Sequence, residues 1–365
     1  MRNSEPEFSP NWYSPPGNSI VAALRQKEIA TAEFAVRAQL SQSDLRALLL
    51  GSRPVDQRVA NALSETVGAS ANYWLARQTD FESNLSKCAQ SVSSKDADSF
   101  MNAFPLSEMR KLGFIDSNQK EIGSILQFFG VRSIEHWKSV YDARLQAVAF
   151  RKSTTLESED ASTLVWLREA ERNASLIDCH SWDKSGFKRC LSELRSLTRN
   201  KNPEIFFPKL VEGCAEFGVA LVFAKAPKAC KASGATMFLN PDKAMIALSF
   251  RHLSDDHFWF SFFHEAAHLI LHDKKALFLE DGSGVTEAEE TEANELASEI
   301  LIPKSRRAEM ESLPARTKPI ISFARDLGVC PGVVVGQMQF FKMIGFNQMN
   351  GLKRRFTWEQ LGNSI

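Results

Sequence analysis

The apolar residues near the start of the chain are spaced as on the buried faces of short helices. They recur at intervals of three and four residues: Phe34, Ala35, Ala38, Leu45, Leu48 and Leu49. Ser41 is placed to cap a helix over residues 41–50, and Gly51 to end it. We expect further helices over residues 18–27, 31–40, 54–67 and 72–80. Two short helices joined by a tight turn within such a bundle are the outline of a helix-turn-helix.

The pattern changes after this bundle and again after Pro203. The stretch before Pro203 contains mostly polar helices, with breaks near residues 91–98 and 152–162. Beyond it, three short β-rich runs separated by turn residues predict a small antiparallel sheet over residues 219–225, 235–239 and 245–250. A strongly apolar helix over residues 256–272 and a second helix over 289–301 follow. Weaker helix-turn-helix patterning returns around Gly328.

The amino-acid composition of the chain argues against several classes of protein. The 365 residues include 44 basic and 44 acidic side chains, so bulk charge does not hold the chain to nucleic acid or to a membrane. Six cysteines are scattered without a Cys-x-x-Cys pair, which argues against a zinc ribbon or thioredoxin motif. The first 19 residues lack an apolar signal core, and no run approaches the roughly 20 apolar residues of a membrane span. We therefore expect a cytoplasmic protein with no membrane partner.

The apolar helix contains a motif typical of a catalytic metal site. His264, Glu265 and His268 form the pattern His-Glu-x-x-His. Residues four apart share a helix face, so both imidazoles can reach one cation, and Glu265 can deprotonate a water on it. Burying these groups without a partner would cost free energy, and a metal ion removes that cost. The motif predicts a Zn²⁺ cofactor with Glu265 as general base.

A catalytic zinc site keeps one open position and needs a third protein ligand. His272 lies one turn beyond His268, too far along a straight helix for easy convergence, so we expect it beside the site. The helix over residues 289–301 offers carboxylates instead. Glu289 and Glu292 flank its apolar stripe, and the spacing does not choose between them.

Three stretches together resemble the ImmA/IrrE family of metallopeptidases. They are MIALSFR at 245–251, FWFSFFHEAAHLILH at 258–272 and EANELASEILIP at 292–303. The resemblance covers residues 200–310 well and the later residues loosely. In that family the glutamate before Ala-Asn is the third zinc ligand. The resemblance therefore implies a metal site of His264, His268 and Glu292.

Residues 18–80 resemble the antitoxin-type helix-turn-helix domains of the HigA/XRE class. The resemblance is carried by FAVRAQLSQSDLRALLLG at 34–51, RVANAL at 58–63 and ANYWL at 71–75. In such domains the second helix of the motif enters the major groove. Contacts to DNA are thereby assigned to Ser41, Gln42, Ser43 and Arg46. The balanced charge of the region and Asp44 in the reading helix leave dimerisation or protein docking as the alternative use.

These patterns predict an α+β chain that is predominantly helical. We expect the following order: a disordered N-terminus at 1–17, a helix-turn-helix bundle at 18–82, a helical connector at 83–200, a zincin-like domain with a small antiparallel sheet at 201–310, and a C-terminal helical segment with helix-turn-helix character at 311–365.

The leading functional hypothesis is a zinc-dependent endopeptidase fused to a DNA-binding regulator. The resemblance implies cleavage of a protein partner, such as a transcriptional repressor or antitoxin, in stress, phage-related or toxin-antitoxin control. A DNA operator and a second copy of the chain in a homodimer are the other expected partners. The alternative is a DNA-binding antitoxin or repressor with a structural or inactive zinc site. Glu265 favours the enzyme, because a structural site has no need of a general base.

Overall fold

The chain folds into two compact units, which are described separately. One unit comprises Met1–Arg144 with Leu156–Ala161, and the other comprises Leu145–Thr155 with Ser162–Ile365. The computed structural model describes residues 14–115, 121–149, 158–249, 251, 253–272, 277–279, 286–358 and 360. Most of the predicted disordered N-terminus, residues 1–13, therefore lies outside the described residues.

The first unit is helical in its described residues. Its helices are α1 (Pro16–Gln26), α2 (Thr31–Arg37), α3 (Gln42–Leu49), α4 (Gln57–Val67), α5 (Ala71–Gln90), α6 (Ser94–Asn102), α7 (Leu106–Lys111), α8 (Glu121–Phe129) and α9 (Ile134–Ala149). The first five confirm the helices predicted before Asp80, although α5 continues to Gln90. The predicted break at 91–98 is shorter than expected, since Ser93 caps α6 through the Asp96 amide. The helix-turn-helix assignment of α2 and α3 stays a prediction.

The second unit contains the sheet, whose topology corrects the sequence-based expectation. Its strands are β1 (Val219–Phe223), β2 (Gly234–Asn240), β3 (Lys243–Leu248) and β4 (Phe278–Leu279), in the order β1-β3-β2-β4. Strand β2 pairs antiparallel with β3 and β4, as expected. Strand β1 pairs parallel with β3, so the prediction of a wholly antiparallel sheet was wrong. The expectation assumed that each strand pairs with the next one along the chain. In the structure β3 lies between β1 and β2, so β1 pairs instead with a strand that is not its neighbour in sequence.

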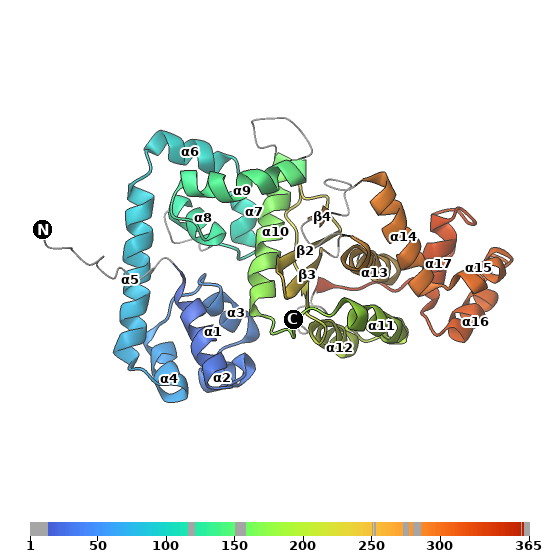
Figure 1. The fold of residues 1–365 in the computed structure, drawn as a ribbon, viewed down its shortest axis with the longest axis horizontal. Coiled ribbons are helices and arrows are strands. Elements are labelled where there is room, and N and C mark those ends of the chain that lie inside the picture. Colours follow the sequence, from blue (N-terminus) through green and yellow to red (C-terminus); the bar gives the residue numbers. More distant parts are fainter. Residues whose placement is uncertain are drawn as a thin grey trace, which may run out of the picture. The chain divides into compact units, whose positions relative to one another are not determined.

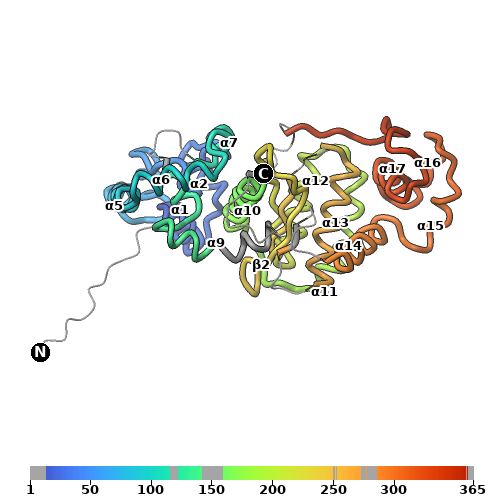
Figure 2. Tube along the Cα trace, turned by 90° about the horizontal axis from the view of Figure 1, so that it is seen from above, coloured from blue at the N-terminus to red at the C-terminus, as the bar shows by residue number. Residues whose placement is uncertain are grey.

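Helices cover both faces of this sheet (Figures 1 and 2). Val219, Leu221 and Phe223 pack in one core with α11 (Lys184–Leu194), α12 (Pro203–Ala215) and α13 (Asp255–Leu271). The alternate residues Ala220 and Val222 pack against α10 (Ser158–Leu176) on the other face. Side chains alternate between faces along a strand, so covering both faces explains why β1 is buried throughout.

The C-terminal helices share the core of α12 and α13. They are α14 (Glu287–Leu301), α15 (Lys304–Glu311), α16 (Thr317–Leu327) and α17 (Pro331–Phe340), and short 3₁₀ turns occur at η1 (Arg195–Arg199) and η2 (Asn350–Leu352). Helix α16 ends at Gly328, which adopts the left-handed conformation with φ 75°. Ile320, Phe323 and Val334 lie in one apolar cluster with Phe262 of α13.

The described chain is mostly helical with a small mixed sheet, which confirms the α+β class. Within the described residues, no single helix has the length and apolar composition to cross a membrane. Helices α16 and α17 meet those criteria only as a pair, and the pair is bent by 108°.

Candidate metal centre

Helix α13 presents the predicted motif inside the second unit. The helix is buried on nearly all sides and begins after Ser254. It confirms the helix predicted over residues 256–272 to within one residue at each end. His264, Glu265 and His268 are 1%, 0% and 1% exposed, so the structure buries all three groups.

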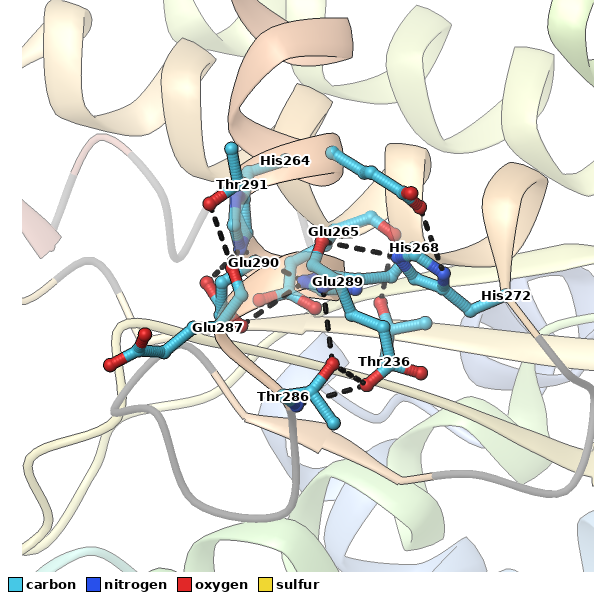
Figure 3. Close-up of polar contacts among 11 residues, drawn as sticks. Thr236, His264, Glu265, His268, His272, Thr286, Glu287, Glu289, Glu290 and Thr291 are labelled. Carbon is cyan, nitrogen blue, oxygen red and sulfur yellow. Dashed lines mark hydrogen bonds and ion pairs between the residues drawn. The ribbon is translucent and has the colours of Figure 1, made fainter.

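The two imidazoles meet a carboxylate from α14 (Figure 3). The Nε2 atoms of His264 and His268 are 3.0 Å apart. The Oε2 atom of Glu290 lies 3.4 Å from His264 Nε2, and its Oε1 atom lies 3.5 Å from His268 Nε2. These three side chains are the His/Cys/Asp/Glu group among the described residues whose ligand atoms converge within 4.8 Å.

The distances and charges of this cluster fit a divalent metal ion. Ligand atoms about 2.0–2.2 Å from a tetrahedral zinc ion lie about 3.3–3.6 Å from one another, close to the separations in the cluster. Burial, followed by the neighbouring His268, lowers the pKa of His264 from 6.5 to about 4. His264 is therefore neutral at pH 7, which is the form that binds metals.

Glu290 takes the position that the family resemblance gave to Glu292. Glu290 precedes the buried residues Ala293, Ala297 and Leu301 by three, seven and eleven residues, so it lies on their face of α14. Glu292 is two residues, or about 200°, further round the helix. Its side chain is 63% exposed and lies 4.0 Å from His272 Nδ1. The expectation that Glu292 reaches the histidine pair is therefore corrected.

Glu289, the other candidate, is used to start the helix. Its Oε2 atom accepts hydrogen bonds from the Thr286 backbone N–H and hydroxyl at 2.9 and 2.8 Å. The Glu289 amide donates to Thr286 Oγ1 at 3.2 Å, completing a capping box. The backbone N–H of Thr286, followed by its hydroxyl, lowers the pKa of Glu289. The cap fixes where α14 begins and so which glutamate faces α13.

His272 lies beside the cluster. Its ring centroid is 5.1 Å from that of His268, and its Nε2 atom is 3.2 Å from the Glu289 carbonyl oxygen. His272 thereby connects the end of α13 to the first turn of α14, and it is not part of the converging ligand group.

Glu265 lies against strand β2. A Cβ atom added to Gly234 would come within 2.8 Å of Glu265 Cγ and 2.9 Å of its Cδ. The Thr236 hydroxyl, two residues along β2, donates to the Glu265 carbonyl oxygen at 3.2 Å. The absence of a side chain at position 234 therefore gives the Glu265 carboxyl group its space between helix and sheet.

The residues predicted to contact DNA lie at the N-cap and in the first turns of α3 in the first unit. Ser41, Gln42 and Ser43 are exposed and Arg46 is partly buried. Ser41 Oγ accepts the N-cap hydrogen bond from the Asp44 amide at 3.1 Å. A role in DNA contact stays a prediction for all four.

A comparison with protein families bears on the second unit. Residues 214–335 match the model of the IrrE N-terminal-like domain of the Peptidase_M78 family. This stretch contains strands β1–β4 and helices α13 and α14. No curated protein and no solved structure matches the chain. The match and the His264–His268–Glu290 cluster inside it support a metallopeptidase-type domain in this part of the chain, similar to the IrrE N-terminal-like domain.

Proposed function

We propose that the chain is a zinc-dependent endopeptidase in which His264, His268 and Glu290 hold the metal and Glu265 is the general base. The observation that carries this proposal is the convergence of two buried imidazoles and one carboxylate at 3.0–3.5 Å. Glu265 is fully buried next to the first imidazole in the sequence. The set of residue types is that of a catalytic site with two His ligands, one Glu ligand and a free Glu base.

The chemistry follows from these roles. Bound zinc lowers the pKa of its water towards about 7 and polarises the carbonyl of the bond to be cut. The Glu265 carboxylate takes a proton from the attacking water and passes it to the departing amine. His264 remains a neutral ligand, because its pKa is about 4. Its ring is stacked on that of Phe260, with centroids 6.1 Å apart, which limits its rotation.

We also propose that the first unit binds an operator and that the substrate is a protein such as a transcriptional repressor. The support is the resemblance of residues 18–80 to HigA/XRE domains and the succession of α2, residues 38–41 and α3. Stress, phage-related or toxin-antitoxin control is the setting implied by that resemblance. The alternative proposal is a DNA-binding antitoxin or repressor with a structural metal site.

Metal content and proteolysis together test the enzyme proposal. Elemental mass spectrometry should find about one zinc per chain in wild type and in Glu265→Gln, and none in His264→Ala. Cleavage of an unfolded protein such as casein should require both the metal and Glu265. Absence of metal from folded wild type, purified without chelators, would contradict the proposal. A gel shift with DNA upstream of its own gene then tests the alternative.

A further inference from the structure

A cluster of exposed basic side chains lies around the first turns of α13, ahead of the candidate metal centre in the same unit. Its members come from three segments of the chain and are Lys225, Lys231, Arg251 and Arg355, all of them exposed. We call this cluster the basic patch. The stretches that supply it, residues 217–241, 243–254 and 343–358, contain no aspartate or glutamate.

Contacts between the three segments hold the basic patch together. The Arg251 guanidinium donates from Nη1 to the Lys231 carbonyl oxygen at 2.7 Å. Arg355 forms an antiparallel bridge with the N-cap residue of α13, three residues after Arg251. Trp358 follows Arg355 by three residues, and the Lys225 Nζ atom lies 5.2 Å from the centroid of its ring. The four cations therefore share one region of the surface.

The two acidic residues that begin α13 do not neutralise the basic patch. Asp255 and Asp256 are only 1% and 6% exposed. Each faces a cation outside the patch, since Arg354 Nε lies 4.0 Å from Asp255 Oδ2 and Lys353 Nζ lies 2.5 Å from Asp256 Oδ2. These two pairs sum to zero charge, so the patch presents its own positive charge to solvent, where it attracts anions.

A small hollow of about 20 Å³ adjoins Arg251. Its polar lining is Ser233, Arg251, Ser254, His257 and Ser261. Because about 10–15 Å³ holds one water-sized group, the hollow admits about one carboxylate oxygen and not a whole side chain. A guanidinium has five N–H donors and can bind a carboxylate through two of them. Arg251 uses one on a backbone carbonyl, so it retains donors for a carboxylate at the mouth of the hollow.

The hollow lies close to the proposed base, Glu265. Ser233 directly precedes Gly234, whose backbone approaches the Glu265 carboxyl group. His257 and Ser261 precede Glu265 on α13 by eight and four residues, or about 12 and 6 Å along the helix. An extended polypeptide advances about 3.3 Å per residue, so these distances correspond to about two to four residues of substrate.

We propose that the basic patch binds aspartate or glutamate side chains of the polypeptide substrate, about two to four residues from the bond that is cut. Proximity to the proposed base favours the substrate as the source of the carboxylates. The inference rests on the proposed peptidase function in that respect. Binding of an acidic peptide does not require catalysis, so the two proposals are tested separately.

The first test measures peptide binding to the full chain carrying Glu265→Gln. The probes are two fluorescein-labelled Gly-Ser peptides, one with three adjacent glutamates and the other with three glutamines in their place, followed by fluorescence anisotropy. At low ionic strength we expect the glutamate peptide to bind about 10-fold more tightly, since each exposed ion pair contributes a factor of about 1.4 to 5. Salt at about 0.5 M should remove most of this preference.

Two double variants of equal charge change assign the preference to the basic patch. Lys231→Gln with Arg251→Gln should reduce it to about 2- to 3-fold, because two of the four cations are lost. Lys188→Gln with Arg189→Gln, at exposed positions of α11 outside the patch, should leave it unchanged. Equal affinity for the two peptides in the parent protein, or an equal effect of the two double variants, would overturn the patch proposal.

Double-stranded DNA of arbitrary sequence, titrated into the same variants, tests the other class of anionic partner. The patch proposal predicts that both double variants bind DNA as the parent protein does. DNA that binds more tightly than the glutamate peptide, and loses affinity in the patch variant but not in the α11 variant, would assign the patch to nucleic acid and overturn the proposal.

A peptide library then connects the basic patch with cleavage. Wild type should enrich cleaved sequences that carry aspartate or glutamate about two to four residues from the cut, and the patch variant should not. Cleavage without any acidic preference overturns the patch proposal and leaves the peptidase standing. Selective binding of the glutamate peptide without cleavage of any peptide supports the patch as a binding surface and overturns the peptidase.

Discussion

Helices α3 and α13 both carry polar side chains to which the sequence assigns a function, but the two helices use them differently. On α3, the exposed Ser41 caps the helix, and Asp44 pairs with Arg53 at 2.5 Å. On α13, His264 and Glu265 are buried among apolar residues, and the first meets another imidazole and a carboxylate. Surface groups that satisfy one another need no ligand, whereas imidazoles buried around one point do. The second arrangement is therefore the stronger indication of function.

The largest expected effect is the loss of activity when the proposed base, Glu265, is replaced. Because Glu265→Gln deletes proton transfer but none of the three proposed ligands, we expect kcat to fall by about 10²- to 10⁴-fold with full metal content. Peptide hydrolysis and elemental analysis of the same sample measure both. Glu295→Gln, at an exposed position of α14, is the matched control and should retain activity. Equal activity in Glu265→Gln and wild type would remove Glu265 from the mechanism.

The next largest effect is expected from the two glutamates of α14 that are alternative metal ligands, Glu290 and Glu292. Glu290→Gln should weaken zinc binding by at least about 100-fold, since even residues that only support metal ligands contribute 10- to 100-fold. Glu292→Gln changes an exposed side chain and should leave the affinity within a few-fold of wild type. Competition with a chromogenic chelator measures both. The reverse ranking would restore Glu292 as the ligand.

Burial of His264 has a consequence for stability as a function of pH. Its folded pKa of about 4 lies below the ordinary value of 6.5, so between these values the unfolded chain binds more protons. The contribution of His264 to stability is complete above pH 6.5 and is lost as the pH falls towards 4. Metal-free wild type should lose about 3 kcal/mol relative to His264→Asn across this window.

Urea unfolding of both proteins at several pH values measures this difference. The Asp255 carboxyl, whose pKa burial raises to about 6, has the opposite pH dependence but is common to both proteins, so it cancels. Parallel stability curves for wild type and His264→Asn would show that His264 is not the titrating group.

The smallest effect is expected for substitutions on α3, where a polar side chain stabilises the helix to which it belongs. Ser41→Ala removes the N-cap hydrogen bond and should lower the free energy of unfolding of the first unit by about 1 kcal/mol. Thermal unfolding of the full chain measures this. Gln42→Ala, at the neighbouring exposed position, is the control for a loss that comes from the cap alone. If both variants weaken binding to an operator at unchanged stability, α3 contacts DNA as well.

Local patterns predicted most of the helices and the pair of imidazoles in the candidate metal centre, because caps and apolar spacing act within a few residues. The motif at His264 needs only one helical turn to bring its imidazoles together. The position of Glu290 was not predicted, because the residue at which α14 begins determines which of its glutamates faces α13. The capping box at Thr286 sets that beginning. The parallel pairing of β1 with β3 was missed because it joins strands that are not sequence neighbours. Gln337 reads as an interruption of an apolar run, and only tertiary packing buries it.

The contact between Gly234 and Glu265 has a consequence for how easily this protein could change its role. Gly234 lies on strand β2, distant in sequence from the proposed metal ligands, and approaches the side chain of the proposed base, Glu265. A single extra carbon there would displace the Glu265 carboxylate, whose atoms are the three nearest to it. A methyl group at this position would therefore separate the proposed peptidase from the alternative proposal, a regulator with an inactive metal site.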